Sequence, residues 1–271
     1  MNLFSNIKFL SKLTFNNIKE YKTKRSSVAC HSITTDSVHW YGHATTVINL
    51  SDTLIVTDPV TSRLLGFFKR VCDIPFDLAK ENIHYILLSH GHMDHLSFWS
   101  LSKLNKNAVV IVPYGYKRMI KLMGYKKVVV LRNGEVYKDN KIKVTALGAN
   151  HDGRRFYVGI DKDSNSYLIE KNDKKVFFAG DTAYTEKFKG LKSDVVLMPV
   201  GCYKPDRFSY MHCTPTEGYE MFNMMDCDAM VPIHYKTFKI SLEDFDETFN
   251  TLFDFNDDRI KLIDIGETYR F

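Results

Sequence analysis

A short apolar run that ends in a dense cluster of histidine and aspartate constrains the fold of this chain most. Residues 83–88 are largely apolar and are typical of a buried β-strand. Four side chains that can bind a metal follow almost at once, and they are His90, His92, Asp94 and His95. Imidazole nitrogens and carboxylate oxygens are ligands for zinc and other divalent transition metals. Because such a cluster directly after a strand rarely arises by chance, we predict a metal site at this strand end.

Three further candidate ligands each follow another predicted strand. They are His151, Asp181 and His234. A single polar residue at a strand end usually serves only as a turn or cap residue, but that explanation is weak for four strand ends in succession. Sites in α/β folds are commonly assembled where the carboxyl ends of strands meet. We therefore predict that the four positions converge on one site.

The remainder of the chain after residue 37 alternates between predicted strands and helices. The predicted strands are residues 38–50, 53–57, 83–88, 108–112, 128–131, 141–147, 157–160, 166–170, 175–179, 194–199, 229–232 and 260–265. Helices are expected near residues 116–123 and 242–253, and a third begins at Thr214, where Pro215 and Glu217 complete a capping pattern. Strands in two similar halves with helices between them predict a layered α/β structure, with two sheets inside and helices outside.

Charge and cysteine content limit the classes of partner and compartment. The net charge is +5, and residues 1–37 supply most of it with six basic and two acidic side chains. The nearly neutral body gives no electrostatic reason to expect a nucleic-acid partner. The five cysteines form no C-x-x-C pair, which favours a reducing, cytoplasmic location over a disulfide framework. No run approaches the roughly 20 apolar residues of a membrane-spanning helix.

Residues 1–37 are predicted to form a basic amphipathic extension that precedes a single domain at residues 38–271. One side of its helical wheel is apolar and the other is basic. The apolar side comprises Leu3, Phe4, Ile7, Leu10, Ile18 and Tyr21, and the basic side comprises Lys8, Lys12 and Lys19. Such a helix can make weak peripheral contact with an anionic membrane, here through residues 1–25. Targeting to an organelle and simple packing on the domain remain open alternatives.

The order of these motifs resembles the metallo-β-lactamase superfamily of metal-dependent hydrolases over residues 38–271. The resemblance implies an αββα sandwich, in which two mixed sheets lie between outer helices. It also implies two divalent metal ions at one rim of the sheets, with zinc expected and manganese, iron or nickel as alternatives. In this scheme one metal takes His90, His92 and His151, the second takes Asp94, His95 and His234, and Asp181 bridges both.

Other stretches resemble the N-acyl phosphatidylethanolamine phospholipase D-like branch of that superfamily. They are residues 40–45, 57–60, 180–184, 211–217 and 232–238. In that branch a histidine at the position of His212 lies in the active site, where it orients substrate or passes a proton. Stabilising the turn before the helix at Thr214 is the alternative role for His212. His43 is interpreted either as an outer contact of the site or, by preference, as a packed core histidine. Arg154 and Arg155 either clamp a phosphate or face solvent.

The expected activity is hydrolysis by a metal-bridging hydroxide, with Asp94, Asp181 and His212 as catalytic residues. Two close divalent ions lower the pKa of a shared water toward about 7 and polarise the group under attack. The branch resemblance favours a phosphodiester or phospholipid-like substrate, either a small molecule or a lipid. A lactonase or another ester or amide hydrolase is the alternative. A redox di-iron protein, which would carry glutamate in place of His92, and a non-catalytic binding protein are less favoured.

Overall fold

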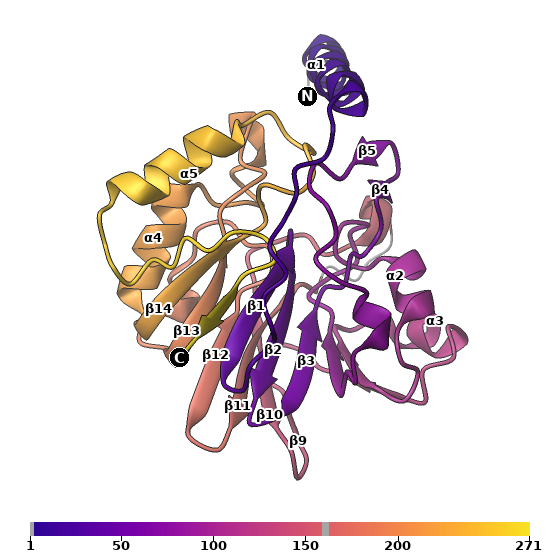
Figure 1. Cartoon of the computed structure of the whole chain (residues 1–271), viewed down its shortest axis with the longest axis vertical. Coiled ribbons are helices and arrows are strands. Elements are labelled where there is room, and N and C mark those ends of the chain that lie inside the picture. The colour runs from indigo at the N-terminus through magenta and orange to yellow at the C-terminus, as the bar shows by residue number, and fades with distance from the viewer. Residues whose placement is uncertain (1–2, 159–162) are drawn as a thin grey trace.

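Two β-sheets packed face to face form the centre of the protein. The computed structural model describes residues 3–158 and 163–271. Figure 1 shows α4 (Pro215–Met224) and α5 (Phe245–Asp254) outside one sheet, and α2 (Phe98–Lys103) and α3 (Lys117–Leu122) outside the other. This four-layer order confirms the predicted αββα sandwich with two mixed sheets.

The first sheet contains seven strands in the order β15-β1-β2-β3-β6-β7-β8. Its members from β15 to β3 pair antiparallel, and those from β3 to β8 pair parallel. The bounds are β1 Ser37–Gly42, β2 Thr45–Leu50, β3 Thr53–Thr57, β6 Tyr85–Leu87, β7 Val109–Val112, β8 Lys127–Val130 and β15 Thr268–Arg270. The parallel strands β3 and β6 therefore end at the same edge of this sheet.

The second sheet contains six strands in the order β14-β13-β12-β11-β10-β9, and β12, β13 and β14 run parallel. The bounds are β9 Val136–Lys138, β10 Lys143–Gly148, β11 Asn165–Lys171, β12 Lys174–Phe178, β13 Lys192–Pro199 and β14 Asp226–Ile233. Phe177 and Phe178 are both fully buried although successive side chains point to opposite faces of a strand. This double burial follows from the position of β12 between the other sheet and a layer of helices.

The other elements are short, apart from the N-terminal helix. That helix is α1 (Leu3–Lys22), and a small hairpin is formed by β4 (Leu64–Leu65) and β5 (Phe68–Lys69). Single 3-10 turns lie at Leu78–Lys80, Arg155–Tyr157, Glu186–Phe188 and Asp206–Phe208. Within the described ranges, no helix is long and apolar enough to span a bilayer.

Three of the predicted strands need correction. Residues 38–50 form two strands, because Gly42 and His43 adopt positive φ angles of 120° and 55° and reverse the chain between β1 and β2. The prediction at 260–265 is wrong, since only Ile260 makes an isolated bridge there, and the last strand lies later at β15. For the prediction at 157–160, Tyr157 ends a 3-10 turn, and residues 159–160 lie outside the described residues.

The helix predicted at Thr214 is confirmed together with its cap. The Thr214 hydroxyl accepts a hydrogen bond from the backbone of Glu217, and the Glu217 carboxylate accepts one from the backbone of Thr214. This reciprocal pair satisfies two donors that a helix start otherwise leaves open. It also fixes the point at which the chain leaves the rim of the sandwich, directly after His212.

Candidate metal centre

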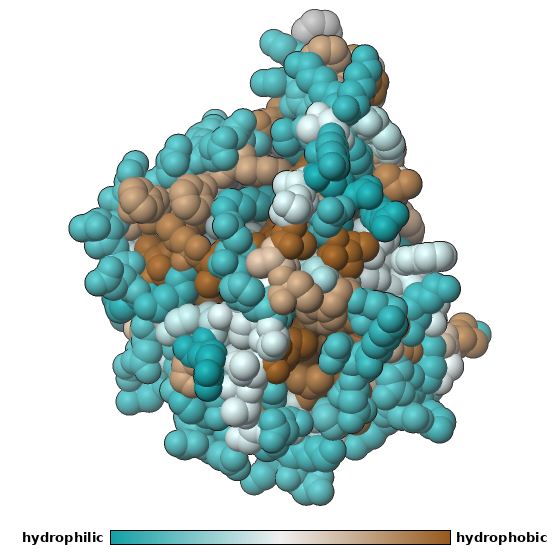
Figure 2. All heavy atoms as spheres, viewed as in Figure 1, coloured by the Kyte–Doolittle hydropathy of each residue, from teal (hydrophilic) through white to brown (hydrophobic). Residues whose placement is uncertain are grey.

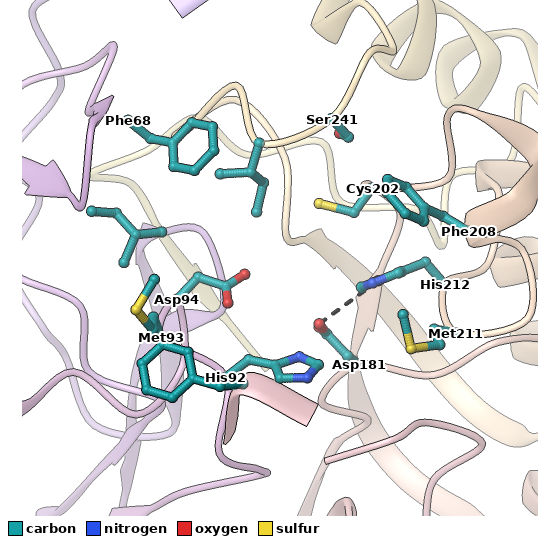
Figure 3. A pocket seen from close by; sticks show the side chains of 13 residues that line it. Phe68, His92, Met93, Asp94, Asp181, Cys202, Phe208, Met211, His212 and Ser241 are labelled. Atoms are coloured by element: carbon teal, nitrogen blue, oxygen red, sulfur yellow. Dashed lines mark ion pairs between the residues drawn. The ribbon is translucent and has the colours of Figure 1, made fainter. Parts of the chain in front are cut away.

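All seven candidate ligands lie together at one rim of the sandwich. They come from the loops that follow β6, β10, β12 and β14, as the strand-end pattern predicts. His90, His95, Asp181 and His234 are buried, whereas His92 and Asp94 retain part of their surface. Figure 3 shows His92, Asp94, Asp181 and His212 around one cavity.

The first group of ligand atoms consists of His90, His92 and His151, which lie within 4.8 Å of one another. Nδ1 of His92 is 3.1 Å from Nε2 of His151. Nδ1 of His151 donates to the carbonyl of Met211 at 2.8 Å, and Nδ1 of His90 lies 2.9 Å from the Ser89 hydroxyl. Outer contacts of this kind orient metal-binding imidazoles and keep the second ring nitrogen available.

The second group consists of Asp94, His95 and His234, together with His43. Nε2 of His95 is 3.1 Å from Nε2 of His234. One oxygen of Asp94 lies 3.5 Å from His95 Nε2 and 3.6 Å from His234 Nε2. The loop of residues 90–95 thus sends its first two histidines to one group and its last two ligands to the other.

Asp181 lies between the two groups. Its carboxylate oxygens are 3.1 Å from Nε2 of His95 and 3.1 Å from Nε2 of His234, and one of them is 3.9 Å from Nε2 of His90. Neither oxygen of Asp181, nor Nε2 of His90, has a hydrogen-bond partner among the described residues. Buried polar atoms nearly always have partners, so these atoms fit the role of metal ligands.

The electrostatics of the cluster favour a bound cation. Burial lowers the pKa of His90 well below its ordinary value, and neighbouring histidines lower it further. Burial raises the pKa of Asp181, but the charges of His234 and His95 outweigh that effect and hold it well below the usual range. The pKa of Asp94 is also well below its usual range, because the charge of His95 outweighs the effect of burial. Against the effect of burial, Asp181 raises the pKa of both His95 and His234 well above the ordinary value. The centre therefore holds ionised carboxylates that attract positive charge, which protons on these two histidines or divalent transition metals can supply.

One residue that the sequence analysis did not assign to the site supports it from outside. Asp58, at the end of β3, is fully buried and accepts hydrogen bonds from the backbone and hydroxyl of Ser89. The Asp58 carboxylate also lies 2.6 Å from Nδ1 of His95. The available signal was the position of Asp58 directly after a strand, the same pattern that identified the ligands. Asp58 also lies within residues 57–60, one of the stretches that resemble the phospholipase D-like branch.

Of the two interpretations of His43, the preferred one, a packed core histidine, is incomplete, and the alternative of an outer contact agrees with the structure. His43 is buried, but its Nε2 lies 3.0 Å from Asp94 and its ring centroid is 4.1 Å from that of His234. Burial, with the neighbouring His234, lowers the pKa of His43 to about 3. The backbone turn that places His43 there has a positive φ angle, which periodicity could not reveal. His43 is therefore an outer contact of the candidate metal centre.

The arginine pair after His151 is engaged by the protein itself. Arg154 forms a 2.7 Å ion pair with Asp152. Nη1 of Arg155 donates to the carbonyls of Gly91 and Leu96, at 3.1 and 2.8 Å. Neither arginine lines the cavity beside the metal ligands. Arg155 instead stabilises both ends of the ligand loop through these hydrogen bonds. This role differs from both predicted alternatives, a phosphate clamp and a solvent-facing side chain.

Gly91 is a sensitive position in the ligand loop. A Cβ atom there would lie 2.0 Å from the Tyr116 hydroxyl, which donates to the carbonyl of Gly153. We expect Gly91→Ala to displace Tyr116 and to lower the free energy of unfolding by about 1–3 kcal/mol. Denaturant unfolding measures this, with Gly124→Ala to show what a substitution at an open, positive-φ glycine costs. Unchanged stability of Gly91→Ala would contradict the close approach of Tyr116.

A family model described as the β-lactamase superfamily domain matches residues 53–235. The chain belongs to the metallo-β-lactamase superfamily. Among relatives of this superfamily member, N-acyl-phosphatidylethanolamine-hydrolyzing phospholipase D 1 of Caenorhabditis elegans is 25% identical, over 92% of this chain and 82% of that protein. A metal-dependent hydrolase of Enterococcus faecalis is 27% identical, over 74% of this chain and 86% of its own length.

Solved structures agree on the fold of this superfamily member. A possible metal-dependent hydrolase from Veillonella parvula superposes with a TM-score of 0.72 at 17% identity, over 88% of this chain and 100% of that one. A metallo-β-lactamase fold protein from Bacillus subtilis gives 0.62 at 12% identity, over 86% and 99%. The superfamily, the relatives and the His/Asp cluster identify the chain as a metal-dependent hydrolase.

Proposed function

We propose that this protein hydrolyses a phosphodiester bond in a phospholipid-like substrate, at a centre of two divalent metal ions. The observation that carries the proposal is the cavity of about 250 Å³ beside the ligands. Apart from the four polar residues at the metal centre and Ser241, its described lining is apolar or sulfur-bearing and includes no lysine or arginine. The apolar part of the lining consists of Leu65, Phe68, Met93, Phe156, Phe208, Met211 and Ile240. Such a wall suits hydrocarbon and disfavours a sugar phosphate.

The ligand roles in this proposal are those of the sequence-based scheme. His90, His92 and His151 would hold one ion, Asp94, His95 and His234 the other, and Asp181 would contact both. Divalent ions bound there supply a nucleophilic water at neutral pH and charge that polarises the phosphoryl group. Zinc fits this donor set, and manganese, iron and nickel fit it as well.

The other contributions come from side chains that face the cavity. His212 lines it, and Nδ1 of His212 lies 3.7 Å from a carboxylate oxygen of Asp181. In the proposed reaction water adds to phosphorus, the bond to the alcohol breaks, and the alcohol leaves with a proton. We assign His212 to orient the phosphodiester and to pass that proton. Phe208 and Met211 would exclude water from the apolar part of the substrate.

The test is a substrate panel with the metal-loaded protein. Diacyl phospholipids in mixed micelles, their deacylated glycerophosphodiesters, and acyl lactones are compared, and products are identified by mass spectrometry. The proposal expects release of a headgroup alcohol from the diacyl substrate, and slower turnover of the deacylated one because it cannot fill the apolar wall. Faster turnover of lactones than of any phosphodiester would support the lactonase alternative instead.

His212→Ala is expected to lower turnover by about 100-fold while the metal content stays unchanged. The reason is that His212 lines the cavity and belongs to neither proposed ligand group, although a ring nitrogen of His212 lies within 4.8 Å of ligand atoms of His151 and Asp181. Elemental analysis and turnover on a soluble phosphodiester measure the two quantities. His31→Ala, at an exposed histidine, is the matched control. Loss of bound metal in the His212 variant would show that His212 is a ligand.

A further inference from the structure

We propose that α1 is an interfacial anchor that seats the mouth of the catalytic cavity on an anionic lipid surface. The inference builds on the proposed function, because a lipid surface is where a phospholipid-like substrate resides. Figure 1 shows α1 projecting from one end of the sandwich, next to β4 and β5. The proposal depends on three features of this helix: its contacts with the body, its outward face, and its contacts with the walls of the cavity.

A narrow strip of α1 joins the helix to the body. Leu13 and Asn17 are buried, and Nδ2 of Asn17 donates to the carbonyl of Lys239 at 2.9 Å. Glu20 forms a 2.8 Å ion pair with Lys239, and its carbonyl accepts from Lys69 at 2.7 Å. These contacts hold the helix in one orientation relative to the domain.

Apart from the Tyr21 hydroxyl, which contacts the β4–β5 hairpin, the predicted apolar side of the helix is not the side that packs on the body. Its described side chains remain 52–55% exposed, and they are Ile7, Leu10, Ile18 and Tyr21. The hydrophobic spheres along the projecting helix are visible in Figure 2, beside hydrophilic ones. Packing on the domain therefore does not cover this face, although that was one of the alternatives from sequence. A stripe of large apolar side chains in water is a typical docking surface.

The charge beside the apolar stripe identifies a negatively charged lipid surface as the partner. Lys8, Lys12 and Lys19 are exposed on the opposite flank of the same outward face, as the helical wheel predicts. A helix that carries apolar and lysine flanks outward lies in the membrane interface, with its apolar side chains among the acyl chains. Lysines near anionic headgroups add attraction that weakens as salt rises.

Two contacts connect this helix to the walls of the cavity. The ring of Phe9 meets that of Phe208, a cavity-lining residue, edge-on at 5.3 Å between centroids. The Tyr21 hydroxyl donates to the carbonyl of Phe67 at 2.8 Å, in the hairpin that carries the lining residues Leu65 and Phe68. These contacts place α1 directly against the walls of the cavity, so a helix docked on lipid would hold those walls close to the lipid surface.

The test measures binding of the full-length protein to vesicles by sedimentation, without any turnover. We expect binding to vesicles of phosphatidylcholine with phosphatidylglycerol, weaker binding at high salt, and little binding to pure phosphatidylcholine. The double variant Leu10→Glu with Ile18→Glu should lower the partition coefficient on the order of 100-fold, because two apolar anchors become charged. Lys8→Gln with Lys12→Gln should weaken binding to the anionic vesicles alone.

Leu122→Glu is the matched control, since Leu122 is 80% exposed on α3 and lies outside the proposed surface. All variants are checked for turnover of a soluble phosphodiester and for mass by light scattering. Equal vesicle binding by the Leu10/Ile18 variant and by the control would overturn the proposal. The proposal would also be overturned if the wild-type protein were a dimer and the Leu10/Ile18 variant a monomer. In that case a second copy of the chain, and not a lipid surface, would cover the apolar side of α1. Vesicle binding without any phosphodiester turnover would contradict the proposed function and leave the docking surface standing.

Discussion

Asp181→Ala is expected to remove bound metal and to lower hydrolysis by well over 100-fold, since even outer contacts of metal ligands are worth about 10–100-fold. Asp181 approaches both histidine groups, at 3.1 Å from His95 and His234 and 3.9 Å from His90. Its loss should therefore weaken both proposed ion sites at once. Elemental analysis and turnover of a soluble phosphodiester measure the two effects on the same preparation.

Asp173→Ala is the control for the Asp181 variant, because it removes an exposed carboxylate from the turn between β11 and β12. Asp181→Asn is a second variant that preserves the shape of the side chain and guards against misfolding. Circular dichroism establishes that each variant is folded. A folded Asp181→Ala protein with near wild-type metal content and rate would refute the bridging role.

Asp58→Ala is expected to lower both stability and metal affinity. Asp58 is fully buried and receives hydrogen bonds from the backbone and hydroxyl of Ser89, and its carboxylate lies 2.6 Å from Nδ1 of His95. Removing one member of such a buried network leaves the other polar groups unpaired, which costs about 3–5 kcal/mol of unfolding free energy. His95 also loses the contact that orients it, so metal affinity should fall about 10–100-fold.

Urea unfolding and metal titration measure the two effects of Asp58→Ala separately. Asp58→Asn keeps the shape of the side chain and one acceptor oxygen, so it should lose less stability and less metal affinity than Asp58→Ala. Asp36→Ala provides a comparison, because Asp36 also accepts a hydrogen bond from a backbone amide, that of Ser51, but contacts none of the candidate ligands. Unchanged metal affinity in folded Asp58→Ala would show that His95 does not depend on this carboxylate.

The sequence by itself determined which candidate ligands lie together at the rim of the sandwich. Each candidate ligand directly follows a strand, and strand and turn signals are local properties of the chain. Since parallel strands bring their carboxyl ends to one edge, local signals sufficed to predict that His90, His151, Asp181 and His234 would meet. The cap at Thr214 was predictable for the same reason, because its hydrogen bonds span only three residues.

Only the tertiary structure decided which residues support that centre and which side of α1 faces outward. His43 and Asp94 are 51 residues apart, and Asp58 and His95 are 37 apart, so their contacts depend on the packing of separate strands. The split of residues 38–50 depends on positive φ angles that no periodicity encodes. For α1, the amphipathic pattern separated apolar from basic residues, but it did not determine which side of the helix packs on the domain. The anchoring contacts of Leu13 and Asn17 lie between those flanks, and burial of this narrow strip is what left the apolar stripe exposed.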